Sequence, residues 1–413
     1  MRFSASCRIK PSRLFAFGLA IGLAGCVAPK VELPAPPAPV VVVPPAPVAG
    51  HPLTQDDASF LRPPNLPAGQ TPVRVGVILP FGSSAAATRN LAAAMMKAAS
   101  LAVYDSHDNH IVLMTADEGN KPADAAAAAT KLLAQGAEVI IGPLFGPSVL
   151  AVTPIARDRG VPVLAFSTDK SVAGNGAYLL SFLPQDEVRR VLTYAAQKGH
   201  HDFAAMVPQN AYGDVVAGAY TEAVKAAGGT SVALQHFTPS ADAVMTPSAT
   251  IAKSPVDAVL IAQGGAILRA IAPSLSFNGL DPNKVKLLGT GLWDDATVGR
   301  EQTLVGGWFA APAPDADDAF NAKYKNAYGA APPPLASLAY DAVSLVALLA
   351  PGPAYHRFTP AALLDPNGFA GVDGIFRFHP DGTSERGLAV LEVTPDGLSV
   401  ADPAPKTFQA PAL

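Results

Sequence analysis

The sequence predicts an α/β protein of two lobes, each a parallel sheet flanked by helices. Short runs of branched apolar residues alternate with amphipathic segments of helical length, which is typical of parallel sheets covered on both faces. This alternation runs through one series and then starts again. Roughly 330 residues follow the N-terminal leader and linker, enough for two lobes of ordinary size.

The first series begins at Val73–Pro80, whose sequence VRVGVILP is typical of a buried strand. Pro122–Gln135 is predicted as a helix because a proline stands in its first turn and Gly136 follows its end. The other elements predicted in this series are helices at Thr88–Tyr104 and Ser148–Arg159, and strands at His110–Ala116, Val139–Ile141 and Val161–Ala165.

The second series repeats the pattern from residue 188 onward. Its predicted elements are helices at Val188–Lys198, Tyr212–Ala227 and Ala266–Leu275, and strands at Phe203–Val207, Ala258–Ala262 and Val285–Leu288. The pattern then changes to a long apolar helix at Leu335–Leu349. After it, the turn residues Pro380, Asp381 and Gly382 predict a hairpin between strands at Gly374–Phe378 and Leu388–Val393.

Residues 1–25 have the pattern of an export signal. Arg2, Arg8, Lys10 and Arg13 precede an apolar run at Leu14–Gly25 that is too short to cross a bilayer as a helix. The run ends in LAGC, which resembles the lipobox of bacterial lipoproteins and implies cleavage before Cys26 and lipid on its thiol. An ordinary signal peptide with a chance cysteine is the alternative. Cys7 lies in the leader, so the mature chain has no cysteine pair for a disulfide.

Residues 26–72 are predicted to be a tether that follows the lipidated cysteine. Val27–Pro72 contains 13 prolines, which favour extended polyproline II over packed structure. At about 3.1 Å per residue such a segment reaches at most roughly 140 Å.

The composition excludes several classes of function. Loss of the four basic leader residues takes the formal charge from −4 to −8, and no basic patch with aromatics points to nucleic acid. Walker, GxSxG and HExxH motifs are absent, and the histidine pairs at 107 and 110 and at 200 and 201 suit solvated loops better than metal. We therefore expect no enzyme activity, no cofactor and no metal site.

Candidate ligand-binding residues follow the predicted strands. In open α/β sheets, ligands bind beyond the carboxyl ends of strands, where helix N-termini offer free N–H groups to a carboxylate. Loops at Pro80–Ser84, Gly142–Ser148 and Phe166–Asp169 combine small residues with hydroxyls, although helix capping explains such residues equally well. The candidates in these loops are Phe81, Ser83, Phe145, Ser148, Ser167, Thr168 and Asp169, and the second series adds Tyr212 and Gln263.

The stretches IIGPLFGPS, GVPVLAFSTD, NAYGD and GIFRFHPDG resemble the type I periplasmic-binding fold, and specifically the leucine-binding protein group. The resemblance covers Val73–Val400. It implies two lobes joined by three crossovers, with a solute held between them. The implied division is 73–183 in lobe 1, 184–310 in lobe 2, 311–350 back in lobe 1, 351–405 back in lobe 2 with the hairpin, and a tail at 406–413.

The resemblance also assigns roles to residues. The hydroxyl that meets the ligand carboxylate falls on Ser148, the loop after the fourth strand on Ser167–Asp169, and the stacking tyrosine on Tyr212. The chain departs from the family at one point. An acid that would hold the ligand ammonium is missing after the glycine pair Gly264-Gly265. Asp169 moreover disfavours a ligand carboxylate beside it.

The GPL and FSTD stretches and the lipobox also resemble lipoproteins known as penicillin-binding protein activators. That resemblance, with the long tether, favours a lipid-anchored periplasmic regulator held in the outer membrane, with a peptidoglycan synthase as partner. The alternative is a receptor for branched-chain amino-acid ABC transport. Such a receptor would bind a small amino-acid-like or peptide ligand and deliver it to an ABC permease.

Overall fold

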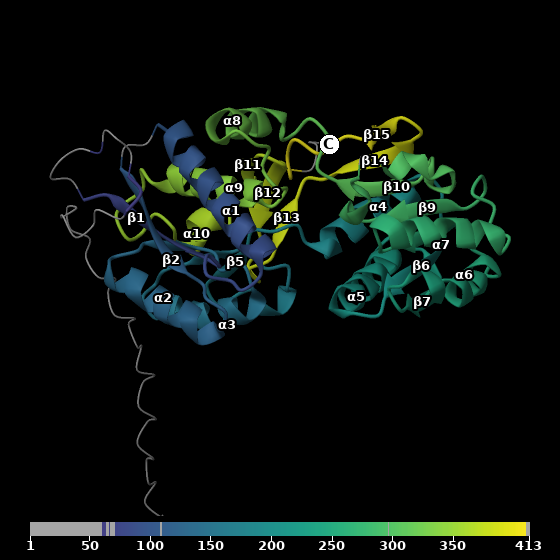
Figure 1. Ribbon diagram of the computed structural model, residues 1–413, viewed down its shortest axis with the longest axis horizontal. Coiled ribbons are helices and arrows are strands. Elements are labelled where there is room, and N and C mark those ends of the chain that lie inside the picture. Colours follow the sequence, from purple (N-terminus) through teal and green to yellow (C-terminus); the bar gives the residue numbers. More distant parts are fainter. Residues whose placement is uncertain (1–59, 63–65, 67–70, 108–109, 296, 410–413) are drawn as a thin grey trace, which may run out of the picture. The chain divides into compact units, whose positions relative to one another are not determined.

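A computed structural model describes residues 60–62, 66, 71–107, 110–295 and 297–409 (Figure 1). The predicted export signal, Cys26 and the predicted tether as far as residue 59 lie outside the described residues. In the described part of the chain, no helix has both the length and the hydrophobicity that a membrane crossing needs.

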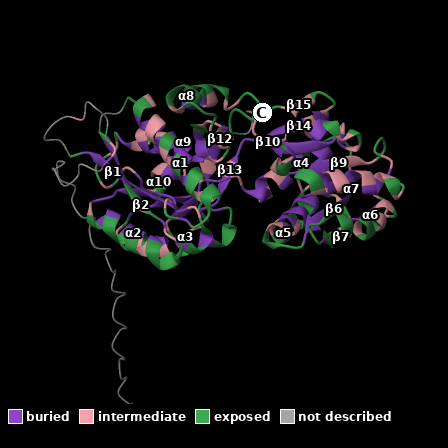
Figure 2. Ribbon diagram, in the orientation of Figure 1, coloured by how far each residue is buried: buried purple, intermediate pink, exposed green. Residues whose placement is uncertain are grey.

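The first lobe is built on a parallel five-stranded sheet in the order β2-β1-β3-β4-β5. Its strands are β1 (Val73–Leu79), β2 (Ile111–Asp117), β3 (Val139–Ile141), β4 (Val163–Ala165) and β5 (Ala177–Leu179). Its helices are α1 (Ala86–Asp105), α2 (Pro122–Ala134) and α3 (Gly146–Arg157). Every residue of β1 is buried, as its branched apolar sequence predicts for a central strand (Figure 2).

The two faces of this sheet have separate cores. On one face β1 packs with α1 and with α9 (Ala336–Leu349), which returns to this lobe from far along the chain. On the other face the sheet packs with α2 and α3. The chain approaches closely at Gly76, where an added Cβ would lie 3.0 Å from Leu132 of α2. This close contact fixes α2 against the middle of the sheet.

The second lobe is built on a seven-stranded sheet in the order β15-β14-β10-β9-β8-β6-β7. Its strands are β6 (Asp202–Pro208), β7 (Thr230–Phe237), β8 (Ala258–Ile261), β9 (Lys286–Gly289), β10 (Trp308–Ala311), β14 (Ala389–Thr394) and β15 (Gly397–Asp402). Helices α4 (Pro184–Gln197) and α5 (Ala211–Ala226) share one core with the sheet, and α6 (Met245–Ala252) and α7 (Gly265–Phe277) share the other. The strands from β7 to β10 are parallel, while β14 and β15 are antiparallel.

A third, three-stranded antiparallel sheet joins β11 (Phe369–Gly371), β12 (Gly374–Phe378) and β13 (Ser384–Arg386). It follows α8 (Asp318–Tyr328), α9 and α10 (Pro360–Leu363) in the chain. Short 3₁₀ helices lie at Lys170–Val172, Ala241–Ala243, Gly291–Trp293, Val298–Arg300 and Gln302–Leu304.

The hairpin prediction is wrong about the second strand. Gly374–Phe378 pairs with Ser384–Arg386, whereas Ala389–Thr394 pairs with β10 in the other sheet. Phe369, Phe376 and Phe378 belong to the core that contains β1. The last return to the second lobe therefore comes after β13 and not at residue 351, because these aromatic side chains are buried in the first lobe. Three crossovers between lobes remain, as predicted.

The predicted tether extends too far. Phe60 is only 8 % exposed and belongs to the core shared with α2 and α3. Leu61 exchanges backbone hydrogen bonds with Leu113 of β2, at 3.0 and 2.9 Å. The proline-rich composition hid these contacts, so the predicted tether cannot include Phe60 and Leu61.

Candidate functional site

The loops that follow β1, β2 and β3 meet at the carboxyl edge of the first sheet. The backbone N–H of Gly82, after β1, donates to Asp117 Oδ1 at the end of β2 at 2.9 Å. An added Cβ at Gly82 would lie 2.2 Å from Asp117 Oδ2, so a larger residue there would have to displace the Asp117 side chain. Asn120 Oδ1 accepts from the N–H of Ser84 at 3.2 Å. Through these contacts, the end of β2 and the loop after it hold the candidate loop after β1 in place.

Glu118 is the central side chain of this edge. It is fully buried, and its two carboxylate oxygens accept hydrogen bonds from the N–H groups of Leu144 at 2.9 Å and Phe145 at 3.0 Å. Burial raises the pKa of Glu118, and the bonds from Leu144, Phe145 and Ser148 oppose that rise. A carboxylate of the protein thus accepts the hydrogen bonds of the N–H groups that precede α3. The N-terminus of a helix is the position that favours anions.

The sequence predicts Ser148 as the hydroxyl that meets a ligand carboxylate. The structure buries Ser148 in the first turn of α3, where its side chain helps to lower the pKa of Glu118. Phe145 lies at the start of the same helix with 44 % of its surface exposed. Two predicted residues therefore lie together, and the Ser148 hydroxyl lies in the electrostatic surroundings of the protein's own carboxylate, Glu118.

The loop after β4 adjoins the start of α3. An added Cβ at Gly146 would lie 3.2 Å from Asp169 Oδ2 and 3.4 Å from Ser167 Oγ. Ser167 is buried and accepts from the N–H of Asp169 at 3.1 Å, while Thr168 and Asp169 are exposed. Asp169 Oδ1 in turn accepts from the N–H of Ser171 at 2.9 Å. The structure thus brings Phe145, Ser167 and Asp169 to one place, and Asp169 also caps a short helix.

The two candidates after β1 have structural roles. Phe81 is partly buried against the core that contains β1. Ser83 is buried, and its Oγ accepts from the N–H of Ala85 at 3.3 Å, one residue before α1. Its backbone carbonyl accepts from Arg89 Nη1 at 2.6 Å. Both residues shape the loop and the start of α1.

Tyr212 lies in the first turn of α5, at the carboxyl edge of the second sheet. Gly213 beside it approaches the Pro208 carbonyl so closely that an added Cβ would lie 1.8 Å from the oxygen. The Tyr212 hydroxyl forms a hydrogen bond of 2.8 Å with the hydroxyl of Thr290, after β9. Burial, and secondarily the charge of Glu187, raises the pKa of Tyr212, so its hydroxyl stays protonated.

Glu187 is a functional candidate that the sequence did not reveal. It lies in the first turn of α4, and its Oε2 accepts from the N–H of Gly291 at 2.9 Å. Burial raises the pKa of Glu187 to about 7; the Gly291 bond opposes this rise and Asp186 adds to it. The sequence places an acid in the first turn of a helix, which the helix dipole explains by itself. Only the fold brings it beside Tyr212.

Gln263 follows β8 and is partly buried. Its Nε2 donates to the carbonyl of its neighbour Gly264 at 3.3 Å. Gly264 packs on the loop after β9, because an added Cβ would lie 2.4 Å from the Leu292 carbonyl. Gln263 therefore lies on the loop next to the one that carries Thr290 and Gly291.

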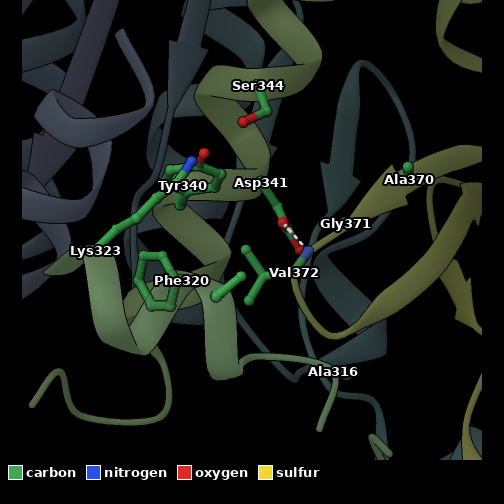
Figure 3. Close-up of a pocket in the computed structure, with 10 residues that line it drawn as sticks. Ala316, Phe320, Lys323, Tyr340, Asp341, Ser344, Ala370, Gly371 and Val372 are labelled. Atoms are coloured by element: carbon green, nitrogen blue, oxygen red, sulfur yellow. Dashed lines mark hydrogen bonds between the residues drawn. The ribbon is translucent and has the colours of Figure 1, made fainter. Parts of the chain in front are cut away.

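A buried ionic cluster lies where the chain returns to the second lobe. Arg386, at the end of β13, contacts Asp341 of α9 with 3.2 Å between Nη2 and Oδ2, and both side chains are buried. Asp341 Oδ1 also accepts from the N–H of Val372 at 2.7 Å, beside a small cavity of about 220 Å³ (Figure 3). Burial raises the pKa of Asp341 to about 7, with Arg386 opposing the rise.

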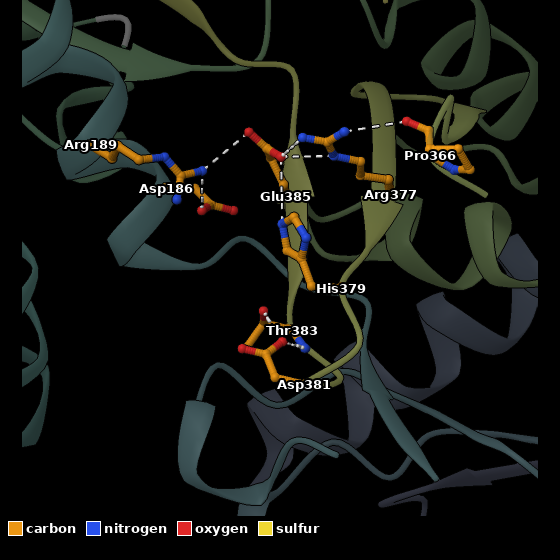
Figure 4. Close-up of polar contacts among 8 residues, drawn as sticks. All are labelled: Asp186, Arg189, Pro366, Arg377, His379, Asp381, Thr383 and Glu385. Carbon is orange, nitrogen blue, oxygen red and sulfur yellow. Dashed lines mark hydrogen bonds and ion pairs between the residues drawn. The ribbon is translucent and has the colours of Figure 1, made fainter. Parts of the chain in front are cut away.

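A second polar network links β12, β13 and α4 (Figure 4). Glu385 Oε2 accepts from Arg377 Nε at 2.9 Å and from Nη2 at 2.7 Å. Glu385 Oε1 accepts from Arg189 Nη2 at 3.4 Å, and Arg189 also pairs with Asp186 at 2.8 Å. Arg189 belongs to α4 of the second lobe, so this network holds the strand that leads to the last crossover.

Within residues 60–62, 66, 71–107, 110–295 and 297–409, no group of three or more His, Cys, Asp or Glu side chains could hold a metal ion. The two edges described above offer acids, hydroxyls and aromatic rings. This set suits binding of a small polar solute.

A model of the periplasmic binding protein family matches residues 72–397. Among solved structures, one named for a branched-chain amino acid ABC transporter of Rhodospirillum rubrum has a TM-score of 0.70 at 19 % identity, covering 80 % of this chain and 99 % of that one. A branched-chain amino acid periplasmic ligand-binding protein from Burkholderia xenovorans has a TM-score of 0.63 at 19 % identity, covering 80 % and 94 %. A substrate-binding protein from Desulfitobacterium hafniense in complex with leucine has a TM-score of 0.59 at 20 % identity, covering 79 % and 99 %.

Among curated proteins, an uncharacterized protein of Rickettsia prowazekii is 23 % identical over 103 residues. That alignment covers 25 % of this chain and only 28 % of the relative. At these identities the structural similarities establish the fold, which is the two-lobed fold that the sequence predicts.

Proposed function

Since the chain belongs to the periplasmic binding protein family, we propose that it is a non-enzymatic receptor that binds a small amine-bearing solute for an ABC importer. The observation that carries this proposal is the carboxylate of Glu187 beside Tyr212 at the carboxyl edge of the second sheet. The similar proteins named for branched-chain amino acid transport support it. They favour the receptor over the regulator that the sequence put first.

Glu187 and Tyr212 suit an ammonium group. One oxygen of Glu187 accepts from the Gly291 N–H, which fixes the carboxylate and leaves acceptor positions for a ligand donor. The Tyr212 ring adds a π face, which attracts cations. Glu187 provides an acid for the ligand ammonium, and the residues after Gly264-Gly265 contain no such acid. The tertiary position of Glu187 thus supports amine recognition.

Glu118 limits how the solute binds in the first lobe. Its carboxylate already accepts from the N–H groups of Leu144 and Phe145. A solute carboxylate would have to displace it or lie beside Asp169, where like charges repel. We therefore propose that the ammonium group, and not a carboxylate, supplies most of the binding free energy.

Three probes that share one side chain test this proposal. They are leucine, 3-methylbutylamine, which lacks the carboxylate of leucine, and 4-methylpentanoate, which lacks its ammonium. Calorimetric titration of the full chain should show binding of 3-methylbutylamine and none of 4-methylpentanoate. Glu187→Gln should abolish the binding, while the exposed control Glu222→Gln should leave it unchanged. Equal binding of all three probes, or an unaffected Glu187→Gln variant, contradicts the proposal.

A regulator of the penicillin-binding protein activator type is the second candidate. It is favoured by Glu118, which fills the anion position of the first lobe, and by the lipobox and proline-rich segment in the sequence. Photo-crosslinking from the exposed Phe145 position in intact cells tests it. Recovery of a peptidoglycan synthase supports the regulator, and recovery of an ABC permease contradicts it.

A further inference from the structure

A cavity outside these edges lies at the opposite end of the first sheet. The strands β3, β4 and β5 are parallel, and Glu138, Pro162 and Gly176, which precede them, line the cavity. The candidate solute loops follow the carboxyl ends of β1, β3 and β4. This amino-end cavity is therefore separate from them. Its volume of about 540 Å³ lies within the range of small-molecule sites.

The walls of the amino-end cavity are aromatic. Tyr178, Tyr355 and Phe358 line it, and Tyr178 and Phe358 are buried. The Tyr178 ring packs against the Phe378 ring, with ring centroids 5.4 Å apart. Aromatic walls of this kind suit an apolar body about the size of a ring.

One wall is held in an uncommon backbone conformation. Tyr355 has a φ of +60°, which a bulky side chain rarely adopts. Its N–H donates to Glu138 Oε2 at 2.9 Å, and Arg357 Nε donates to the same oxygen at 3.0 Å. The first bond holds the Tyr355 backbone, and the Arg357 guanidinium balances the charge of Glu138. The acid that lines the cavity therefore leaves little negative charge there.

Arginines supply the charge at the cavity. Arg157, the last residue of α3, has a side chain 53 % exposed, and its ion pair with Asp158 spans 3.9 Å. Arg159 lines the cavity as well, and it forms no ion pair with any acid in the described part of the chain. Guanidinium groups bind carboxylate, sulfonate and phosphate oxygens through paired N–H donors.

We propose that the amino-end cavity binds a second small ligand, a monoanion with an apolar body. The body lies against Tyr178, Tyr355 and Phe358, and the anion pairs with Arg157 and Arg159. This site is independent of the solute site proposed above, because it uses other residues at the other end of the sheet. A protein with both sites has one ligand position at the carboxyl edge of its second sheet and one at the amino end of its first sheet.

A matched pair of probes separates charge from shape. The probes are 2-naphthoate, an aromatic monoanion, and 2-naphthamide, its neutral counterpart. In calorimetric titration of the full chain we expect 2-naphthoate to bind more tightly. The double variant Arg157→Gln/Arg159→Gln should weaken 2-naphthoate at least tenfold and leave 2-naphthamide within twofold. The control Arg269→Gln/Arg300→Gln, which carries the same charge change in the second lobe, should weaken neither.

A second variant tests the position. Thr359→Trp places a large ring among the lining residues and should abolish binding of both probes, with the melting temperature as a check on folding. An unchanged 2-naphthoate affinity in Arg157→Gln/Arg159→Gln overturns the proposal, as does the absence of 2-naphthoate binding to the full chain. Binding that appears only after deletion of residues 30–48 also overturns it, because the chain's own proline-rich segment would then be the occupant.

Discussion

Glu118 Oε1 accepts a hydrogen bond from the backbone N–H of Phe145, 3.0 Å away, at the residue that caps α3. Oε2 accepts the N–H of Leu144 in the same way. A helix start that would otherwise attract a ligand anion is thereby satisfied from within the protein. The Glu118 carboxylate therefore stabilises the carboxyl edge of the first sheet. It also underlies the proposed preference for an amine over a carboxylate ligand.

Replacing Glu118 should destabilise the first lobe. Glu118→Ala leaves the part-buried N–H groups of Leu144 and Phe145 without an acceptor, which we expect to lower the free energy of unfolding by about 1–3 kcal/mol. Urea denaturation measures this, and the exposed Glu222→Ala should stay within about 0.5 kcal/mol. Acetate, but not acetamide, should restore part of the loss. Equal effects of both additives would contradict an anion position before α3.

Ligand affinity should depend on pH through Glu187. An ammonium ligand needs the ionised carboxylate, and the pKa of Glu187 is raised to about 7. Affinity for 3-methylbutylamine should therefore rise up to tenfold per pH unit below 7 and level off above it. Titrations between pH 5 and 8.5 check this. A pH profile that persists in Glu187→Gln would assign the titration to another group.

The same carboxylate should lower the stability of the ligand-free protein at high pH. The folded pKa of Glu187, about 7, exceeds the 4.5 of an unperturbed glutamate, so between these values the folded state binds more protons. The contribution of Glu187 to the free energy of unfolding is most favourable below pH 4.5 and is lost as pH rises through 7. Because Glu187 is partly exposed, we expect Glu187→Gln to raise the free energy of unfolding at pH 8 by only about 1–2 kcal/mol. A Glu187→Gln variant that is less stable than the wild type at pH 8 would contradict this.

Removing Arg386 should be costly. Its guanidinium is buried against Asp341, and it also lies 4.7 Å from the Phe182 ring centroid. Arg386→Met leaves Asp341 as a buried acid without its cation, so we expect a loss of about 3–5 kcal/mol in urea denaturation. The double variant Arg386→Met/Asp341→Asn should lose less than the sum of the two single losses. Additive losses would show that the two side chains are not coupled.

Cys26 should determine membrane attachment. Its place after Leu23-Ala24-Gly25 predicts lipid on the thiol, so Cys26→Ser should lose palmitate labelling and move to the soluble periplasmic fraction. Sucrose-gradient fractionation of the wild type then distinguishes inner from outer membrane. A wild-type protein that takes up no label would favour an ordinary export signal.

Much of the fold could be predicted because its signals are local. The buried strand at 73–79 and the proline-started helix at 122–134 show their type in a few consecutive residues. β7 was missed because its sequence TSVALQHF mixes polar and apolar residues on a partly buried edge strand. The hairpin was assigned to the wrong partner because Ser384–Arg386 is short and polar, whereas the stronger strand at 389–394 pairs with β10.

The sequence by itself determined the α/β class, the two series of elements and the loops that carry the candidate residues. Only the tertiary structure decided which of those residues remain available to a ligand. Glu118 reaches Phe145 across 27 positions, and Glu187 reaches Gly291 across 104. Periodicity and capping report on neighbours within a few residues, whereas hydrogen bonds between distant loops form only when the sheets align the ends of their strands.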